Sequence, residues 1–143
     1  FKKIEIDIQH HFLNQDYQFF ISEYSGHFLT LPKRAVEEGF THFIAVGGDG
    51  TLNEIVNGLI EAFRTENGYD WERISQIKIG ILPSGSGNDF IKNLGYTTID
   101  ELQSLIAKDS SALVDVGFAE FLNREKQKSE RFFINVSDVG IGG

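Results

Sequence analysis

The feature that most constrains the fold is residues 47–51, Gly-Gly-Asp-Gly-Thr, which separate an apolar run from an amphipathic helical pattern. The preceding residues 42–46 are nearly all apolar, which is typical of a strand buried on both faces of a parallel sheet. The following apolar residues recur with helical spacing from Leu52 to Phe63. Glycines let a backbone approach a ligand closely, and a helix start attracts phosphate. The segment therefore predicts a strand, a phosphate-binding turn and a helix.

A second glycine-rich loop follows another apolar run. Residues 77–82 read as a strand, and residues 82–90 have the sequence Leu-Pro-Ser-Gly-Ser-Gly-Asn-Asp-Phe. Ligands bind at the carboxyl edge of open parallel sheets, so two such loops could close over one nucleotide. We expect polar contacts to that nucleotide from Ser86, Asn88 and Asp89. The alternative is a flexible turn in which Asp89 only caps a short helix.

Asp49 is the one ionisable residue of the first loop, and its carboxylate could hold Mg²⁺ or orient the nucleotide. The alternative is a tight strand-to-helix turn in which Asp49 or Thr51 acts only as a cap. Neither the P-loop string nor the dinucleotide fingerprint Gly-x-Gly-x-x-Gly is present. The sequence therefore indicates a phosphate site of another kind.

The N-terminal part of the chain gives weaker patterns. Isoleucine alternates with charged residues over residues 3–8, which predicts a strand, and the aromatic residues 17–24 predict a second strand. A helix is expected from about residue 28 or 30 to residue 38, with Pro32 in its first turn. Gly39 is the expected end of that helix.

The later elements are predicted by caps and by a change in pattern. Threonine followed three residues later by glutamate predicts a capping box at residues 51–54 and another at residues 98–101. A short helix is expected over residues 90–94, and two strands over residues 113–122 and 131–139.

Alternating strands and helices followed by consecutive strands indicate an α/β domain and then a β-rich region. We therefore predict an α/β nucleotide-binding domain over residues 1–110 and the beginning of a second domain over residues 111–143. The chain contains no methionine and stops directly after an apolar run, which suggests that segments are missing.

Composition excludes several classes. The net charge of −8 argues against nucleic-acid binding, which needs a basic surface. The chain lacks cysteine, so disulfides and cysteine-based zinc sites are excluded, and it has no apolar run of about 18 residues that could span a membrane. The simplest expectation is a cytoplasmic location.

The two loops together resemble the catalytic domain of diacylglycerol kinases. The pattern is shared by bacterial lipid kinases and by sphingosine and ceramide kinases. Its Gly-Gly-Asp-Gly core also occurs in NAD kinases and phosphofructokinases, but the second loop, ending Gly-Asn-Asp-Phe, favours the bacterial diacylglycerol kinase branch. The resemblance covers about residues 17–143. It implies a Rossmann-like parallel sheet flanked by helices, followed by the start of a β-sandwich domain.

The resemblance also implies a site. The nucleotide would be bound by the first loop, by a hydroxyl residue of the second loop, and by a serine before a Gly-His pair. Ser22 is the best match for that serine, and Ser25 is the alternative. The expected nucleotide-binding residues are Ser22, Gly47, Gly48, Asp49, Gly50, Thr51, Leu52, Asn53, Ser86, Asn88 and Asp89. Asp49 is the expected metal residue, the cofactors are ATP and Mg²⁺, and the catalytic base is expected in the missing domain.

The implied activity is transfer of the ATP γ-phosphoryl group to the hydroxyl of a membrane lipid resembling diacylglycerol. Such an enzyme would touch the membrane peripherally from the cytoplasm, would not bind nucleic acid, and could form a homodimer. The alternatives are an NAD kinase-like enzyme, a phosphofructokinase, and a regulatory module that binds nucleotide without catalysis. The sequence departs from the family at its start, where the usual Asn-Pro loop is not visible, and at Pro32.

Overall fold

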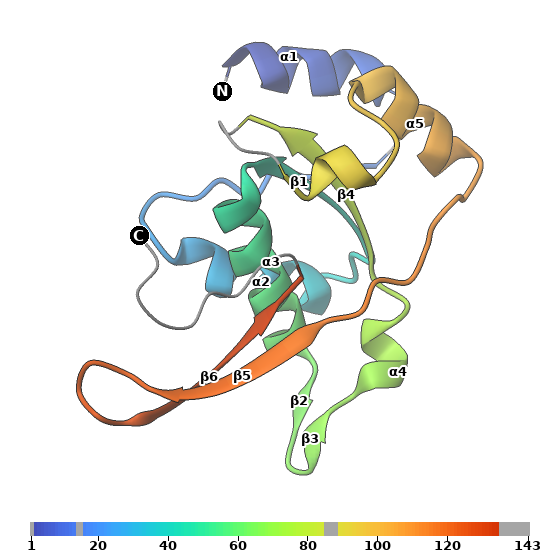
Figure 1. Cartoon of the computed structure of the whole chain (residues 1–143). Helices are drawn as coiled ribbons and strands as arrows, with labels where there is room; N and C mark the ends of the chain where they lie inside the picture. Colours follow the sequence, from blue (N-terminus) through green and yellow to red (C-terminus); the bar gives the residue numbers. More distant parts are fainter. Residues whose placement is uncertain (1, 14–15, 85–88, 135–143) are drawn as a thin grey trace.

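The chain forms a small parallel sheet with helices on both sides (Figure 1). The computed structural model describes residues 2–13, 16–84 and 89–134. In chain order the elements are α1 (Lys2–His11), η1 (His27–Leu29), α2 (Leu31–Glu37), β1 (His42–Gly47), α3 (Asp49–Ala62), β2 (Arg64–Thr65), β3 (Gly68–Tyr69), α4 (Trp71–Ile74), β4 (Lys78–Pro83), η2 (Ile91–Asn93), α5 (Ile99–Ala107), β5 (Gly117–Leu122) and β6 (Lys128–Phe133).

The parallel pair of strands places both glycine loops at one edge. β1 pairs with β4 in register from His42 opposite Lys78 to Gly47 opposite Pro83, so both strands end at the same level. Figure 1 shows α2 and α3 on one side of this pair and α1 and α5 on the other. The predicted α/β class, with a parallel sheet flanked by helices, is confirmed.

Helix α3 is the centre of the hydrophobic core. Its predicted apolar face is buried, and the buried residues are Leu52, Ile55, Val56, Leu59 and Ile60, followed by Phe63 just beyond the helix. On another side, Gly58 lies so close to η1 that an added Cβ would be 2.6 Å from the backbone oxygen of Phe28. Glycine at this position lets α3 and the segment before α2 pack in direct contact.

The prediction of a strand over residues 3–8 is wrong, because these residues lie within α1. Ile4 and Ile8 are four residues apart, so they lie on one helical face and pack against the core together with Phe12. Ile6, which a strand would bury with them, is 62% exposed. α1 lies against α5, where Gln103 donates a hydrogen bond to the backbone oxygen of His11.

The strand predicted over residues 17–24 is also wrong, since residues 16–23 have no regular secondary structure. Its aromatic residues pack instead through their side chains. Phe19 packs against the core, and the Phe20 ring meets Phe40 edge to face at 5.8 Å and lies under the guanidinium of Arg34. The helix expected next is present as η1 and α2, with Pro32 in the first turn of α2, and Gly39 beyond its end has a positive φ of 94°.

The two predicted capping boxes have different outcomes. The box at Thr98 is confirmed, because its hydroxyl accepts the backbone N–H of Glu101 while the Glu101 carboxylate accepts that of Thr98. The box at Thr51 is wrong. α3 begins two residues earlier, at Asp49, with Gly48 as its N-cap, so Thr51 lies inside the first turn.

The C-terminal strands form an antiparallel hairpin, β5–β6, shown in orange and red in Figure 1. The first strand is shorter than predicted and begins at Gly117 rather than at residue 113. The second begins earlier, at Lys128, because the turn occupies only residues 123–127. Residues 135–139 of the predicted strand lie outside the described residues, and the boundary at residue 110 stays a prediction. None of the described helices is long and apolar enough to cross a membrane.

Candidate functional site at the glycine loops

The first glycine loop is shaped by contact between Gly47 and Thr51. A Cβ atom added to Gly47 would lie 2.6 Å from both Cβ and Oγ1 of Thr51, which is too close for any side chain. Gly47 also accepts a hydrogen bond at its backbone oxygen from the N–H of Ser84, at 3.1 Å. The ends of β1 and β4 are therefore joined where the two loops begin.

The carboxylate of Asp49 links the two loops directly. Its Oδ2 accepts the backbone N–H of Asp89 at 3.1 Å, and its Oδ1 accepts that of Phe90 at 3.2 Å. One side chain at the start of α3 therefore holds the residues that lead into η2. Asp49 therefore caps the other loop rather than its own helix, and its role as a metal or nucleotide ligand stays a prediction.

The start of α3 is open to a ligand. Gly48 has an extended backbone, and no side chain caps the helix. The first N–H groups of an α-helix have no partner within the helix, and together they carry a partial positive charge. Gly50 is exposed, and no atom of the described residues lies within 4 Å of the position that a Cβ would take. This end of α3 offers backbone donors and free space, which is what a phosphate group requires.

Tyr96 binds the strand that leads into the second loop. Its hydroxyl accepts the backbone N–H of Ile81 at 2.7 Å, on the edge of β4 away from β1. Burial raises the pKa of the Tyr96 phenol above its usual value, although the bond from Ile81 opposes this shift. The phenol therefore stays neutral. A small pocket beside the two loops is lined by Gly47, Gly48, Asp49, Leu52, Ile81, Phe90 and Ile91.

The structure brings most of the predicted first-loop residues together at the start of α3. Leu52 differs from the others, because its side chain is buried in the core. Asn53 uses its backbone oxygen to accept a bond from Asn57. In the second loop, Asp89 is placed beside Asp49, and its carboxylate pairs with Lys92 at 2.6 Å. Ser86 and Asn88 lie outside the described residues.

Ser22 is not joined to the glycine loops by any hydrogen bond within the part of the chain that the structure describes. Its hydroxyl donates to the backbone oxygen of Tyr24 at 3.1 Å, and the neighbouring rings of Tyr24 and His27 stack at 4.2 Å. The strand on which the sequence placed Ser22 is absent among residues 16–23. The nucleotide contact of Ser22, like those of the other site residues, stays a prediction.

The side chains around the glycine loops fit a metal ion that is bound jointly with phosphate better than an ion that is bound by protein side chains alone. Among the described residues, no three histidine, aspartate or glutamate side chains gather around a common point. Asp49 accepts one N–H at each carboxylate oxygen, and such an oxygen has a second lone pair available. Mg²⁺ is commonly bound by one or two carboxylates together with substrate phosphates and water. Asp49 is compatible with that mode.

Sequence analysis missed Asn57, a residue that connects this site to the C-terminal hairpin. It is a buried amide on α3, within a run of buried apolar residues, and it binds the backbone of Phe132. An amide within an apolar helix segment was the available signal. Its partner was not predictable, because it lies 75 residues away in the sequence.

The family comparison covers the part of the chain that holds both glycine loops. The family model described as the diacylglycerol kinase catalytic domain matches residues 2–119. A diacylglycerol kinase of Staphylococcus carnosus (strain TM300) is 35% identical over 109 residues, which cover 76% of this chain and 29% of that protein. A diacylglycerol kinase of Staphylococcus aureus (strain JH9) is 33% identical over 109 residues, 76% of this chain and 28% of the relative. No solved structure matches the chain.

Proposed function

The chain belongs to the diacylglycerol kinase catalytic domain family, and from that premise we propose that it supplies the ATP site of a lipid kinase. The proposed reaction transfers the γ-phosphoryl group of ATP to the hydroxyl of a diacylglycerol-like lipid. Since the aligned residues cover only 29% of the S. carnosus relative, this chain corresponds to one part of such an enzyme.

The observation that carries the proposal is the bridge from Asp49 to the N–H groups of Asp89 and Phe90. This bridge holds two glycine loops side by side at the carboxyl ends of β1 and β4, the edge where open α/β sheets bind ligands. Between them, the uncapped start of α3 presents backbone N–H groups. A triphosphate placed there would be bound by neutral donors, without any basic side chain in the first loop.

Phosphoryl transfer depends mainly on positioning the reactants and on balancing the charge that develops. The N–H groups of residues 49–51 would hold the phosphates, and Thr51 would add its hydroxyl. Asp49 would hold Mg²⁺, which supplies positive charge to the phosphate oxygens when bound. The base that takes the proton of the lipid hydroxyl is proposed to come from the chain beyond Ile134. A lipid acceptor implies peripheral contact with the membrane.

The proposal is tested by following γ-phosphoryl transfer from labelled ATP in the full-length protein. Diacylglycerol in mixed micelles and NAD in solution are offered as acceptors. Labelled phosphatidic acid is the expected product. We expect Asp49→Ala to reduce its formation by at least 100-fold, because both the bridge between the loops and the metal carboxylate are lost. A labelled dinucleotide would instead identify an NAD kinase, and ATP binding without any labelled product would identify a regulatory module.

A further inference from the structure

Among the described residues, Asn57 is the one buried residue with a polar amide or charged side chain. All of its side-chain hydrogen bonds are made to backbone groups or to the side chain of Asn53. Its Nδ2 donates to the backbone oxygen of Asn53 at 2.8 Å and to that of Phe132 at 2.8 Å. Its Oδ1 accepts the N–H of Phe132 at 3.0 Å. Both hydrogens and the carbonyl oxygen of this amide are therefore used in the interior, where an unpaired polar group is costly.

The Asn57 amide binds the N–H and the oxygen of Phe132 in the way that a neighbouring strand would. Phe132 lies opposite Phe118 in the β5–β6 hairpin. Since its N–H and its oxygen both bind Asn57, they point away from β5, and Phe118 and Phe132 form a pair without mutual hydrogen bonds. The amide of Asn57 thus occupies the outer edge of β6. It fixes which residue of β6 meets α3, because a shift of one residue would turn these groups away.

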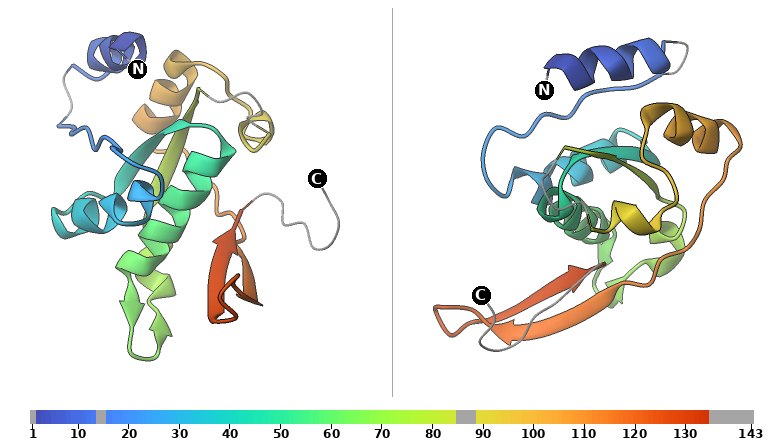
Figure 2. Two further views of the ribbon diagram at one scale, coloured as in Figure 1. Left: turned by 90° about the vertical axis from the view of Figure 1, so that its left-hand side faces the viewer. Right: turned by 45° about the horizontal axis from the view of Figure 1, so that its top comes forward.

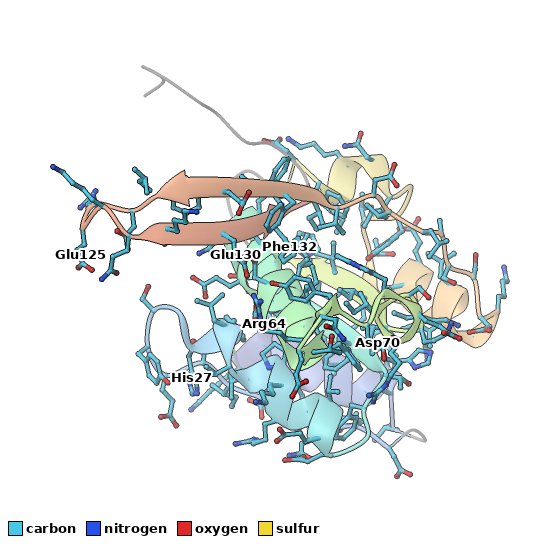
Figure 3. All side chains as sticks on the ribbon, turned by 90° about the horizontal axis from the view of Figure 1, so that it is seen from below. His27, Arg64, Asp70, Glu125, Glu130 and Phe132 are labelled. Carbon is cyan, nitrogen blue, oxygen red and sulfur yellow. The ribbon has the colours of Figure 1, made fainter. Side chains whose placement is uncertain are left out.

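A second contact fixes the same strand to the end of α3. Glu130 accepts a hydrogen bond from the Tyr69 hydroxyl at 2.8 Å and forms an ion pair with Arg64, which also pairs with Glu61. Figure 3 shows Arg64, Glu130 and Phe132 gathered beneath the hairpin. The Phe132 ring meets the rings of Tyr69 and Trp71 edge to face, with centroids 5.1 and 5.9 Å apart. Strand β6 is therefore held at Glu130 and at Phe132.

The phosphate-binding end and the hairpin are both attached to one rigid helix. Asn57 lies eight positions after Asp49, about 12 Å along the axis of α3 from the rise of 1.5 Å per residue. Figure 2 shows the hairpin beside the far half of α3 and away from the ends of β1 and β4. The position of β6 is therefore set relative to the glycine loops by α3.

From this arrangement we propose that Asn57 is a positioning residue for phosphoryl transfer. Its amide fixes Phe132, and with it β6, in one orientation relative to the glycine loops. This inference rests on the proposed function, in which the proton acceptor comes from the chain beyond Ile134. Asn57 itself does not contact the nucleotide. It acts through the placement of the group that takes the proton of the lipid hydroxyl.

The test compares Asn57→Leu with Gln103→Leu in the full-length protein. Leucine keeps the size of the side chain but leaves both backbone groups of Phe132 unpaired. Gln103 offers a matched control, because it too donates an amide N–H to a backbone oxygen, between α5 and α1. We expect Asn57→Leu to lower kcat for diacylglycerol phosphorylation by 10-fold or more while the Kd for MgATP changes less than 2-fold. Gln103→Leu should leave both constants within 2-fold of the native values.

A second variant and a second measurement cover the case in which Asn57→Leu does not fold. Glu130→Ala removes the other attachment of β6 at the surface, and it should lower kcat about 3-fold with no change in MgATP affinity. Hydrogen exchange at the Phe132 amide should be at least 10-fold faster in Asn57→Leu, or 2-fold or more faster in Glu130→Ala.

The outcomes separate the two proposals. A native protein that neither binds MgATP nor phosphorylates lipid overturns the proposed function, and the exchange rate of Phe132 still reports whether Asn57 holds β6. Unchanged exchange, or unchanged kcat in both the Asn57 and the Glu130 variants, overturns the positioning role. An equal loss of MgATP affinity and of kcat also contradicts it, because a positioning residue would affect only the chemical step.

Discussion

The two ends of helix α3 differ in what surrounds them. Its N-terminus is preceded by two glycines, and no side chain of the described residues caps its first N–H groups. Toward its C-terminus, Asn57 binds the backbone of Phe132 and Arg64 pairs with Glu130. The ring of Phe132 packs against Tyr69. One end is thus the proposed ligand site, while the other is packed against the C-terminal hairpin. If the proposal is correct, each end of α3 can be disturbed separately.

The largest effect on stability is expected at the filled end. Phe132→Ala removes a ring that is only 4% exposed and packed against Tyr69, Trp71 and Phe118, and such truncations cost about 3–5 kcal/mol. Urea unfolding measures this change. The control is Phe121→Ala on the same hairpin, where the ring is 47% exposed and a loss of less than about 1 kcal/mol is expected. Equal losses from the two variants would show that the hairpin is not anchored through Phe132.

At the open end, two glycines should respond in opposite ways. Gly47→Ala would push a Cβ into Thr51 and should reduce the free energy of unfolding by about 1–3 kcal/mol. Gly50→Ala meets no neighbouring atom and should keep or slightly raise stability, because alanine favours a helix by about 1 kcal/mol over glycine. A phosphate at the helix start needs that space, so we expect Gly50→Ala to weaken MgATP binding at least 10-fold. Native affinity in Gly50→Ala would place the phosphates elsewhere.

A smaller effect is expected behind the second loop. Tyr96→Phe removes the hydroxyl that accepts the Ile81 N–H and should lower the free energy of unfolding by about 1–2 kcal/mol. The same variant should raise hydrogen exchange at Ile81 while exchange at Phe132 stays native. An equal change at both amides would mean that the two ends of α3 are not independent, and the comparison would fail.

The smallest effect is the pH dependence of the ion cluster at the filled end. Hydrogen bonds from Arg64 lower the pKa of Glu61 and of Glu130 below the ordinary glutamate value of 4.5. A lowered pKa adds stability that is present above the unfolded pKa and is lost as the pH falls through the folded value. The native protein should therefore lose stability below about pH 4.5, and Arg64→Met should lose less over the same range. Parallel pH profiles in thermal unfolding would contradict this account.

The parts that sequence predicted best are those in which local pattern and burial agree. The apolar run before Gly47 is strand β1, the helical spacing after it is α3, and Thr98 with Glu101 forms the predicted capping box. Residues 3–8 were misread because isoleucines at every second position also include a pair four residues apart. The cap at Thr51 was misplaced because the helix start left open at Gly48 has no side-chain signal.

The contacts that unite the site could not be read from local pattern. The bridge from Asp49 to Asp89 spans 40 residues, and the bond from Asn57 to Phe132 spans 75. Both contacts are made to backbone groups, which every residue carries. The residue type of the partner therefore does not predict the contact. Spacing predicted which loops lie at the sheet edge, but not which side chain would hold them together.

The most direct test of the open-end account is calorimetric titration of MgATP into the native protein, Gly48→Asp and Phe121→Ala. A carboxylate at position 48 would occupy the helix start and repel phosphate, while Phe121 lies on the distant hairpin. We predict binding by the native protein and by Phe121→Ala, and a loss of at least 100-fold in affinity for Gly48→Asp. Equal affinity in all three proteins would contradict it.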